Sequence, residues 1–240
     1  MSSTSRRSNG STFLGRASVK RPTLIFGAGT LARLAYLEAQ EAGDVEVIGF
    51  VVDDGFHTAD RFLDLPLYRW TDARERFDPS RVYLHTAIGY REMRARAAAF
   101  AKLNAAGFAF VNIVSPRSHV SRHATLGTNN FVMAGTVIEA NARIGSNNVL
   151  WSNATVCHDS AIGDHNFIAA NSTLGGHVVV GNLNFLGFSC VVRERIRIGS
   201  ETLVGAQALV LADTREQSVY FGSPARWIRP IDPAAGIVFT

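Results

Sequence analysis

The sequence predicts an α/β Rossmann-like domain followed by an all-β parallel β-helix of hexapeptide repeats. At a spacing of six residues, every position from Val114 to Val210 is Ile, Leu or Val. Neither an α-helix nor an ordinary strand has that period, and a fixed short period indicates a solenoid. Before residue 114 the pattern changes, because short apolar strands there alternate with Ala-rich helical stretches. That alternation is typical of an α/β domain.

The six-residue period has a simple physical reading. Each rung of a parallel β-helix points one side chain into a narrow prism, and a mid-sized aliphatic residue fills that space. Burial of each aliphatic contributes about 1.5–3 kcal/mol, so the ladder can support a domain against the cost of chain entropy. Asn130, Asn148, Asn166 and Asn184 are predicted at the corners, because Asn tolerates the left-handed backbone region.

The flat faces of the predicted β-helix carry large apolar side chains. Examples are Phe131, Phe167, Phe185 and Phe188. Large apolar patches are rarely left bare in water, so we expect a trimer to cover these faces.

Composition divides the chain into four predicted segments. Residues 1–20 are rich in Ser, Thr and Arg and lack acidic residues. We expect a disordered arm there, with an organellar transit peptide as the alternative. Residues 21–113 are predicted to form the α/β domain, residues 114–214 the β-helix and residues 215–240 a C-terminal tail.

The α/β domain is predicted to contain four strands and two helices. The strands are expected at 23–26, 45–52, 81–87 and 108–114, and the helices at 30–42 and 90–106. Gly43 and Gly107 follow the two helices, in the position where glycine commonly ends a helix.

Charge and composition exclude several classes of protein. The net charge is +4, but five of the 24 basic residues lie within the first 21 positions, so the rest of the chain is near neutral. This distribution gives no nucleic-acid footprint. No apolar run is long enough to span a bilayer, and we expect a cytoplasmic protein. Cys157 and Cys190 are expected to be reduced packing thiols.

A glycine-rich turn connects the first predicted strand to the first helix. Gly27, Ala28, Gly29 and Thr30 begin a G-x-G-x-x-A pattern, which can present backbone N–H groups to a phosphate. Asp53 and Asp54 end the next strand, where a ribose hydroxyl would bind. Alternatively, the glycines only permit a close turn. The predicted α/β domain has fewer than about a hundred residues, which is too short to contain a second mononucleotide-binding half. This disfavours a nicotinamide cofactor.

Several motifs together resemble one family. They are GAGTLA at 27–32, AIGYREMR at 87–94, VCHDSAIG at 156–163, LGGHVVVG at 174–181, FLG at 185–187, VGA at 204–206 and GSPAR at 222–226. With these motifs the chain resembles the sugar O- and N-acyltransferases of the sialic acid O-acetyltransferase and bacillosamine or perosamine N-acetyltransferase type. The resemblance implies a left-handed β-helix, a homotrimer with active sites between subunits, acetyl-CoA as co-substrate, and a nucleotide-linked sugar held by the N-terminal domain.

Acyl transfer from a thioester needs a base and an oxyanion donor, but no metal. His158 is the candidate base, and Asp159 is expected to orient its imidazole. By resemblance Gly176 lies one coil further on, so its N–H is the candidate oxyanion donor. His165 and His177 are predicted to be solvated surface residues, with a place in the same groove as the alternative. We predict no metal site, because the histidine spacing does not match a three-histidine zinc centre.

The resemblance also assigns residues to the two substrates. Gly187, Gly205, Ala206, Pro224 and Arg226 are expected to bind acetyl-CoA. Arg193, Arg195 and Arg197 could hold its phosphates or only keep the surface soluble.

Gly89 and Trp151 are candidate substrate-binding residues in addition to those of the Gly-rich turn. The Trp151 indole is expected to stack on a sugar. This chain has Gly29-Thr30-Leu31 where relatives usually have Gly-Gly-His, a departure that could alter or abolish nucleotide-sugar binding. It has Trp151 where many relatives have Asn, which suggests a different acceptor.

The sequence therefore predicts an acetyl-CoA-dependent enzyme that acetylates the amino group of a nucleotide-linked amino sugar for surface-glycan synthesis. O-acetylation of a free or nucleotide-linked sugar, such as a nonulosonic acid, is the first alternative. A non-catalytic trimeric scaffold that binds nucleotides is the second.

Overall fold

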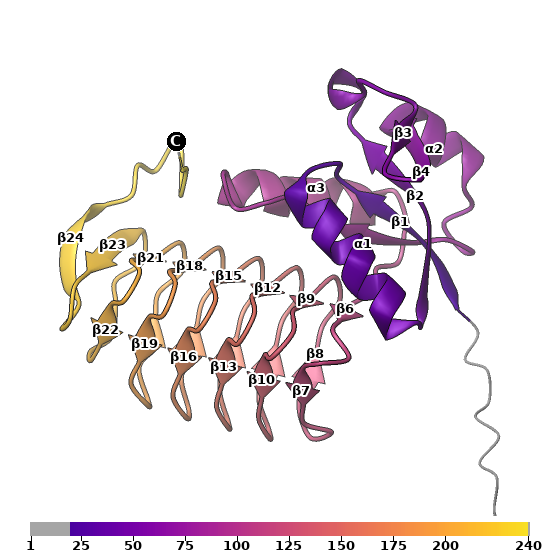
Figure 1. Cartoon of the computed structure of the whole chain (residues 1–240). Helices are drawn as coiled ribbons and strands as arrows, with labels where there is room; N and C mark the ends of the chain where they lie inside the picture. Colours follow the sequence, from indigo (N-terminus) through magenta and orange to yellow (C-terminus); the bar gives the residue numbers. More distant parts are fainter. Residues whose placement is uncertain (1–19, 240) are drawn as a thin grey trace, which may run out of the picture.

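The computed structural model describes residues 20–239. Except for Lys20, the predicted N-terminal arm lies outside these residues. The chain forms an α/β domain that covers one end and one face of a long β-helix, and the C-terminal segment returns across the same face (Figure 1). The predicted fold class is confirmed: a Rossmann-like domain precedes a left-handed parallel β-helix.

The α/β domain has a five-stranded sheet in the order β3-β4-β2-β1-β5, parallel except for β3. Its elements are β1 (Arg21–Phe26), α1 (Thr30–Ala42), β2 (Val45–Val52), the short 3-10 helix η1 (Asp54–Phe56), β3 (Arg61–Phe62), β4 (Leu65–Arg69), α2 (Trp70–Arg76), β5 (Tyr83–Thr86) and α3 (Met93–Ala105). Helix α1 has its predicted bounds and ends at Gly43, which adopts φ 77° and donates its N–H to the Ala39 carbonyl.

Three features of this domain differ from the prediction. The β3–β4 hairpin and α2 were missed, because residues 55–80 have neither a clear helical nor a clear strand period. Helix α3 begins at Met93 rather than at residue 90. The strand expected at 108–114 is only a single bridge between Phe110 and Leu84, and Ile113 already belongs to the β-helix.

The β-helix has three parallel sheets. Each strand residue pairs with the residue 18 positions further on, as Val149 does with Phe167. The eight-stranded sheet holds β6 (Ile113–Val114), β9 (Phe131–Val132), β12 (Val149–Leu150), β15 (Phe167–Ile168), β18 (Phe185–Leu186), β21 (Leu203–Val204), β23 (Ser218–Phe221) and an antiparallel β24 (Arg226–Pro230). The six-stranded sheet holds β7 (His119–Val120), β10 (Val137–Ile138), β13 (Thr155–Val156), β16 (Thr173–Leu174), β19 (Val191–Val192) and β22 (Leu209–Val210). The five-stranded sheet holds β8 (Thr125–Leu126), β11 (Arg143–Ile144), β14 (Ala161–Ile162), β17 (Val179–Val180) and β20 (Arg197–Ile198).

The six-residue aliphatic ladder fills the prism as predicted. From Val132 to Val210 its members are at most 4% exposed, whereas Val114, Val120 and Leu126 are half-buried at the open end. The interior also contains a polar ladder that the sequence analysis placed wrongly at the corners. The side-chain oxygens of Asn130, Asn148 and Asn166 point inward, and each accepts the backbone N–H of the residue 18 positions later.

The left-handed corner residues lie elsewhere and form three rows. One row is Asn129, Asn147, His165, Leu183 and Glu201, a second is Asn141, Asp159, His177 and Arg195, and a third is Gly135, Asn153, Asn171, Ser189 and Gln207, all with φ between 54° and 73°. The α/β domain packs on the first row, which we call the docking corner. We call the second row the base corner, because His158 precedes Asp159.

Aromatic side chains join the α/β domain to the eight-stranded sheet. The Tyr90 ring lies 4.8 Å from Phe167, and Phe239 of the C-terminal tail lies 4.5 Å from Phe185. Phe131, Phe167 and Phe185 are therefore at most 6% exposed within a single chain. These three residues do not need a trimer to cover them, so that part of the argument for a trimer is wrong.

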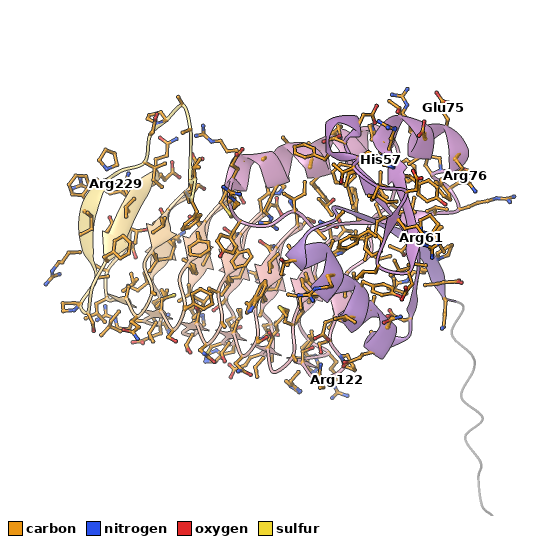
Figure 2. The ribbon with its side chains drawn as sticks, turned by 45° about the horizontal axis from the view of Figure 1, so that its top comes forward. His57, Arg61, Glu75, Arg76, Arg122 and Arg229 are labelled. Carbon is orange, nitrogen blue, oxygen red and sulfur yellow. The ribbon has the colours of Figure 1, made fainter. Side chains whose placement is uncertain are left out.

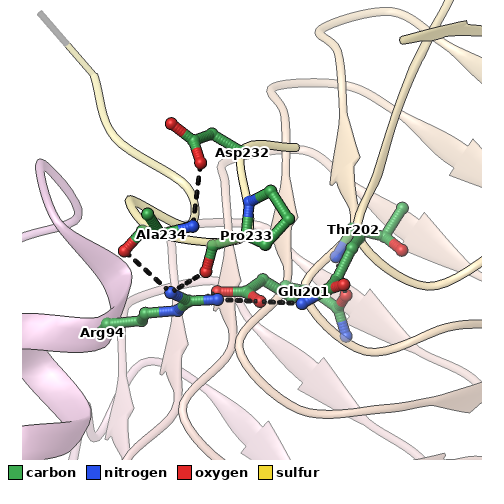
Figure 3. A network of polar contacts seen from close by, with 8 residues as sticks. Arg94, Glu201, Thr202, Asp232, Pro233 and Ala234 are labelled. Carbon is green, nitrogen blue, oxygen red and sulfur yellow. Dashed lines mark hydrogen bonds and ion pairs between the residues drawn. The ribbon is translucent and has the colours of Figure 1, made fainter. Parts of the chain in front are cut away.

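The C-terminal tail is held by Arg94 of α3 (Figure 3). The Arg94 guanidinium donates two hydrogen bonds to Glu201 at 2.5 and 2.7 Å, and others to the carbonyls of Pro233 and Ala234. Burial raises the pKa of Glu201, but hydrogen bonds from Arg94 and Gln217 outweigh it, so the pKa lies below its usual value.

None of the helices in the described part of the chain has both the length and the apolar character needed to cross a bilayer. Charged side chains lie at both ends of the molecule, with Arg76 at the end of the α/β domain and Arg229 at the opposite end (Figure 2). Cys157 and Cys190 are free thiols.

Candidate functional site

His158 lies in the turn between β13 and β14, and its side chain is 56% exposed. Its Nδ1 is 2.9 Å from Oδ2 of Asp159, and its backbone N–H donates to the Glu139 carboxylate at 2.8 Å. These contacts fix both the backbone and one side of the ring. Nε2 lies beside Gly176 and takes part in no hydrogen bond within residues 20–239, so it is the ring nitrogen available to another molecule.

Asp159 determines which tautomer of His158 is favoured. Hydrogen bonds from His158 and then from Asn141 lower the pKa of the Asp159 carboxyl, so it is ionised at neutral pH. An ionised carboxylate only accepts hydrogen bonds, which assigns the proton of neutral His158 to Nδ1. Nε2 then carries the free lone pair that a general base requires.

Gly176 lies directly beside the His158 ring, one coil further along. A Cβ atom at this position would lie 2.8 Å from two ring atoms of His158, so any other residue would displace the imidazole. Among the backbone hydrogen bonds of residues 20–239, none uses the Gly176 N–H as its donor. The predicted oxyanion donor is therefore open and adjacent to the predicted base.

His165 and His177 lie on different corners of the β-helix. The His177 ring is perpendicular to that of His158 at 5.4 Å, and its Nε2 is 4.0 Å from Oδ2 of Asp159. His165 instead lies on the docking corner, 2.8 Å from Asn147 and against Phe100. Burial lowers the pKa of His165. Only His177 shares the surface of the candidate base.

The base corner also contains a set of possible metal ligands. Atoms of His158, Asp159 and His177 that can bind a metal all lie within 4.8 Å of one another. Two imidazoles and a carboxylate are a common donor set for a divalent cation. The spacing arises from the coil period, and the sequence analysis did not anticipate it.

A cavity of about 410 Å³ opens at the carboxyl ends of β1, β2 and β5. We call it the turn cavity, because the Gly-rich turn forms one wall. Its lining includes five predicted residues, namely Gly27, Ala28, Gly29, Asp53 and Gly89, together with Phe26, Val52, Phe56, Ala87 and Ile88. Ligands of open α/β sheets typically bind at this edge.

The glycines of the turn and Gly89 differ in how much space a Cβ atom would have. Gly27 has φ 129°, and a Cβ there would lie 2.8 Å from the Ala87 carbonyl oxygen, so the fold itself requires this glycine. A Cβ on Gly29 or Gly89 would meet nothing within 4 Å. A close turn alone therefore explains why residue 27 is a glycine, but not why residue 29 is one. Gly29 leaves open space at the N-terminus of α1.

Lys102 is a cavity residue that the sequence analysis missed. It forms an ion pair with Asp53, and its Nζ lies 4.8 Å from the centre of the Phe26 ring. It lines a second cavity of about 690 Å³, beside Ala95 and Ala98 of α3, which we call the helix cavity. The two cavities share Asp53, Phe56, Ile88 and Gly89, so they are adjacent, and we call them together the cleft.

Comparison with known proteins agrees with this geometry. The family described as bacterial transferase hexapeptide (six repeats) matches residues 123–158 and 141–176. A histidine-to-asparagine mutant of perosamine N-acetyltransferase from Caulobacter crescentus, solved with CoA and GDP-perosamine, is 29% identical with a TM-score of 0.79. The match covers 87% of this chain and 97% of that one. The chain is an acyltransferase.

Two more distant structures share the fold of the acyltransferase. The acetyltransferase domain of PglB from Neisseria gonorrhoeae, solved with acetyl coenzyme A, is 23% identical over 88% of this chain and all of that one, with a TM-score of 0.79. WeeI from Acinetobacter baumannii is 18% identical over 87% of this chain and all of that one, with a TM-score of 0.78. No curated protein sequence matches the chain.

Three residues predicted to bind substrate, Thr30, Asp54 and Trp151, do not line the turn cavity. Asp54 accepts hydrogen bonds from the hydroxyl and N–H groups of Thr71 near the start of α2, and these bonds lower its pKa. Trp151 packs 5.5 Å from the Phe167 ring on the eight-stranded sheet, and β13 separates it from His158. Thr30 begins α1, directly after Gly29.

Packing accounts for two glycines that were predicted to bind acetyl-CoA. A Cβ on Gly187 would lie 2.6 Å from the backbone nitrogen of Ala206, and one on Gly205 would overlap the Phe221 ring. Ala206, Pro224 and Arg226 are exposed at the C-terminal end of the acyltransferase, as are Arg193, Arg195 and Arg197. Their role toward a ligand stays a prediction.

The candidate base and the cleft lie on different sides of one chain. His158 follows a strand of the six-stranded sheet, whereas the α/β domain with its cleft lies over the eight-stranded sheet (Figure 1). Neither the turn cavity nor the helix cavity is lined by a base-corner residue.

Proposed function

We propose that the acyltransferase moves an acetyl group from acetyl-CoA to the amino group of a nucleotide-linked amino sugar. The observation that carries this proposal is the placement of the His158–Asp159 pair over Gly176, beside an unused backbone N–H. A base with a free lone pair and an adjacent oxyanion donor are what acyl transfer from a thioester requires.

The proposed reaction uses these groups in order. The amine nitrogen attacks the thioester carbonyl, and Nε2 of His158 takes the proton as the new C–N bond forms. The Gly176 N–H donates to the oxyanion of the tetrahedral intermediate. Collapse breaks the C–S bond, and the proton on His158 passes to the departing thiolate of CoA. Asp159 orients the ring and stabilises the imidazolium that forms between the two proton transfers.

The proposed acceptor is a nucleoside diphosphate sugar bound in the cleft. The N-terminus of α1 at Gly29 would face the phosphates, and Asp53 with Lys102 would contact the nucleoside. The perosamine N-acetyltransferase structure contains a nucleotide-linked amino sugar and CoA, which supports this class of acceptor. An amine attacks a thioester more readily than a hydroxyl, so N-acetylation is the first choice.

A homotrimer is proposed because one chain does not bring the cleft to His158. A neighbouring subunit would place its cleft against the base corner, so each active site would be shared by two chains. The predicted acetyl-CoA residues from Gly187 to Arg226 would then lie along the edge of the same interface.

A thiol-release assay tests the proposal. The enzyme is mixed with acetyl-CoA and a panel of nucleotide-linked amino sugars, the corresponding free sugars and a free nonulosonic acid. We expect CoA release only with a nucleotide-linked amino sugar, and none with the His158→Ala variant. Release with the free nonulosonic acid alone would assign O-acetylation instead. Thiol release that persists unchanged in His158→Ala would contradict the proposed chemistry.

A further inference from the structure

Arg96 of α3 is the largest fully buried side chain in the described structure, at 1% exposure. Its guanidinium donates three hydrogen bonds to backbone carbonyls: Nε to Ile88 at 3.0 Å, Nη1 to His165 at 3.2 Å and Nη2 to Asn147 at 3.0 Å. The Ile88 carbonyl belongs to the segment between β5 and α3. The other two belong to successive coils of the docking corner, so one planar group joins three separate segments.

The charge of Arg96 is unusual because no carboxylate neutralises it. Among residues 20–239 no ion pair includes Arg96, and burial lowers its pKa to about 10, which still leaves it protonated at neutral pH. A buried unpaired charge is costly unless its donors are fully used. Within the same residues, no backbone N–H donates to the three carbonyls that Arg96 binds. The guanidinium therefore satisfies oxygens that docking of α3 removes from water.

The docking corner also binds the segment between β5 and α3 at a second point. The Asn129 side-chain oxygen accepts the backbone N–H of Thr86 at 2.7 Å, at the end of β5. The Asn147 side chain donates back to the Arg96 carbonyl at 3.4 Å. Residues 86–96 are thus attached to the β-helix on either side of Ile88 and Gly89, which line both the turn cavity and the helix cavity.

We propose that Arg96 is a positioning residue that fixes the Ile88–Gly89 wall of the cleft to the β-helix and thereby sets the affinity for the nucleotide part of the acceptor. This inference rests on the proposed function, because it assumes that the cleft binds a nucleotide. Arg96 does not line either cavity. Its effect is transmitted through the Ile88 carbonyl.

Arg94 provides a matched control on the same helix. It also binds the docking corner, through Glu201, and it holds the C-terminal tail, but it has no hydrogen bond to Ile88. Arg94→Gln and Arg96→Gln each remove one positive charge and one link between α3 and the β-helix. Only Arg96→Gln releases the wall of the cleft.

The test compares these variants with the wild type by calorimetric titration with nucleoside diphosphates, by KM for each substrate, and by melting temperature. We expect Arg96→Gln to raise the dissociation constant of the bound nucleoside diphosphate and the KM of the nucleotide sugar about tenfold or more. The KM of acetyl-CoA should stay within about twofold of the wild-type value. Arg94→Gln should lower the melting temperature but leave the nucleotide affinity near that of the wild type. Arg96→Lys, with one donor centre instead of a fork, should be intermediate.

Equal nucleotide affinity in the wild type and in the Arg96 variants would overturn this inference alone, and Arg96 would then be a structural residue only. If Arg96→Gln does not fold, Arg96→Lys replaces it in the comparison, and unchanged nucleotide binding in that variant overturns the inference in the same way. A wild type that binds no nucleoside diphosphate overturns both this inference and the proposed acceptor.

Discussion

The docking corner and the base corner have the same backbone but opposite surroundings. Both are rows of left-handed residues that repeat once per coil, such as Asn147 and His165 in one row and Asp159 and His177 in the other. At the docking corner α3 buries the row, and its side chains and carbonyls are hydrogen-bonded to Thr86, Arg94 and Arg96. At the base corner His158 and His177 stay about half exposed.

The difference shows that corner conformation alone does not identify a functional histidine. Burial lowers the pKa of His165, and its Nδ1 is occupied by Asn147, so it has a structural role. His158 has one nitrogen fixed by Asp159 and the other free, beside a glycine that leaves room for the ring. The same β-helix thus attaches a domain at one corner and exposes the candidate base at another.

The largest contrast between the corners is expected from removing one histidine from each. His158→Ala should lower kcat by about 10²–10⁴, because the general base is lost, and should leave the melting temperature nearly unchanged. His165→Ala should do the opposite: its kcat at saturating substrate should stay near that of the wild type, while its melting temperature falls. Steady-state kinetics and thermal unfolding of the two variants provide the measurement. Similar losses of kcat in both would remove the distinction between the corners.

A smaller effect is expected from adding one methyl group beneath the candidate base. Gly176→Ala places a Cβ 2.8 Å from the His158 ring and should force the imidazole to move. We expect kcat to fall about 10- to 100-fold, since small displacements of a catalytic group are costly. Gly55→Ala is the control, because a Cβ there meets nothing within 4 Å. Unchanged turnover in Gly176→Ala would mean that the ring position in the structure is not the catalytic one.

The smallest expected effect is the pH dependence of stability that Glu201 contributes at the docking corner. The pKa of Glu201 is lower in the folded chain than its ordinary value of 4.5, so its contribution to stability is present above pH 4.5 and is lost as the pH falls through the folded-state pKa. The Glu201→Gln variant should lack this acid-dependent loss. Near neutrality the melting temperature of the wild type should exceed that of Glu201→Gln by about 2–4 °C. When both are measured from about pH 6 to about pH 3, the two melting temperatures should converge at low pH. Parallel curves for the two proteins would contradict the assignment.

The β-helix could be predicted because its signal is local and repeated. Every sixth residue enters the prism, so the period alone places Val132 or Leu150 in the core. His158 and Gly176 were instead found through the motifs of the family that the chain resembles, in which they lie one coil apart. The glycine-rich turn was likewise visible as a short motif next to a strand.

The contacts between the two parts of the chain were not predictable in the same way. Lys102 meets Asp53 across 49 residues, and Arg96 meets His165 across 69, with no spacing rule that connects either pair. Phe131, Phe167 and Phe185 have the apolar character of an intersubunit surface, but residues from the α/β domain and the tail bury them within one chain. Sequence periodicity reports which face is apolar, but not what covers it.

The central claim is that the cleft of one chain works with the base corner of another. Subunit complementation tests it most directly, with His158→Ala subunits that keep the cleft and Gly29→Val subunits that keep the base. Each variant alone should be inactive, while trimers assembled from an equal mixture should recover about a quarter of wild-type turnover, because about one interface in four combines two intact halves. If the mixture shows no activity above that of the separate variants, both halves of the active site come from the same chain and the account is contradicted.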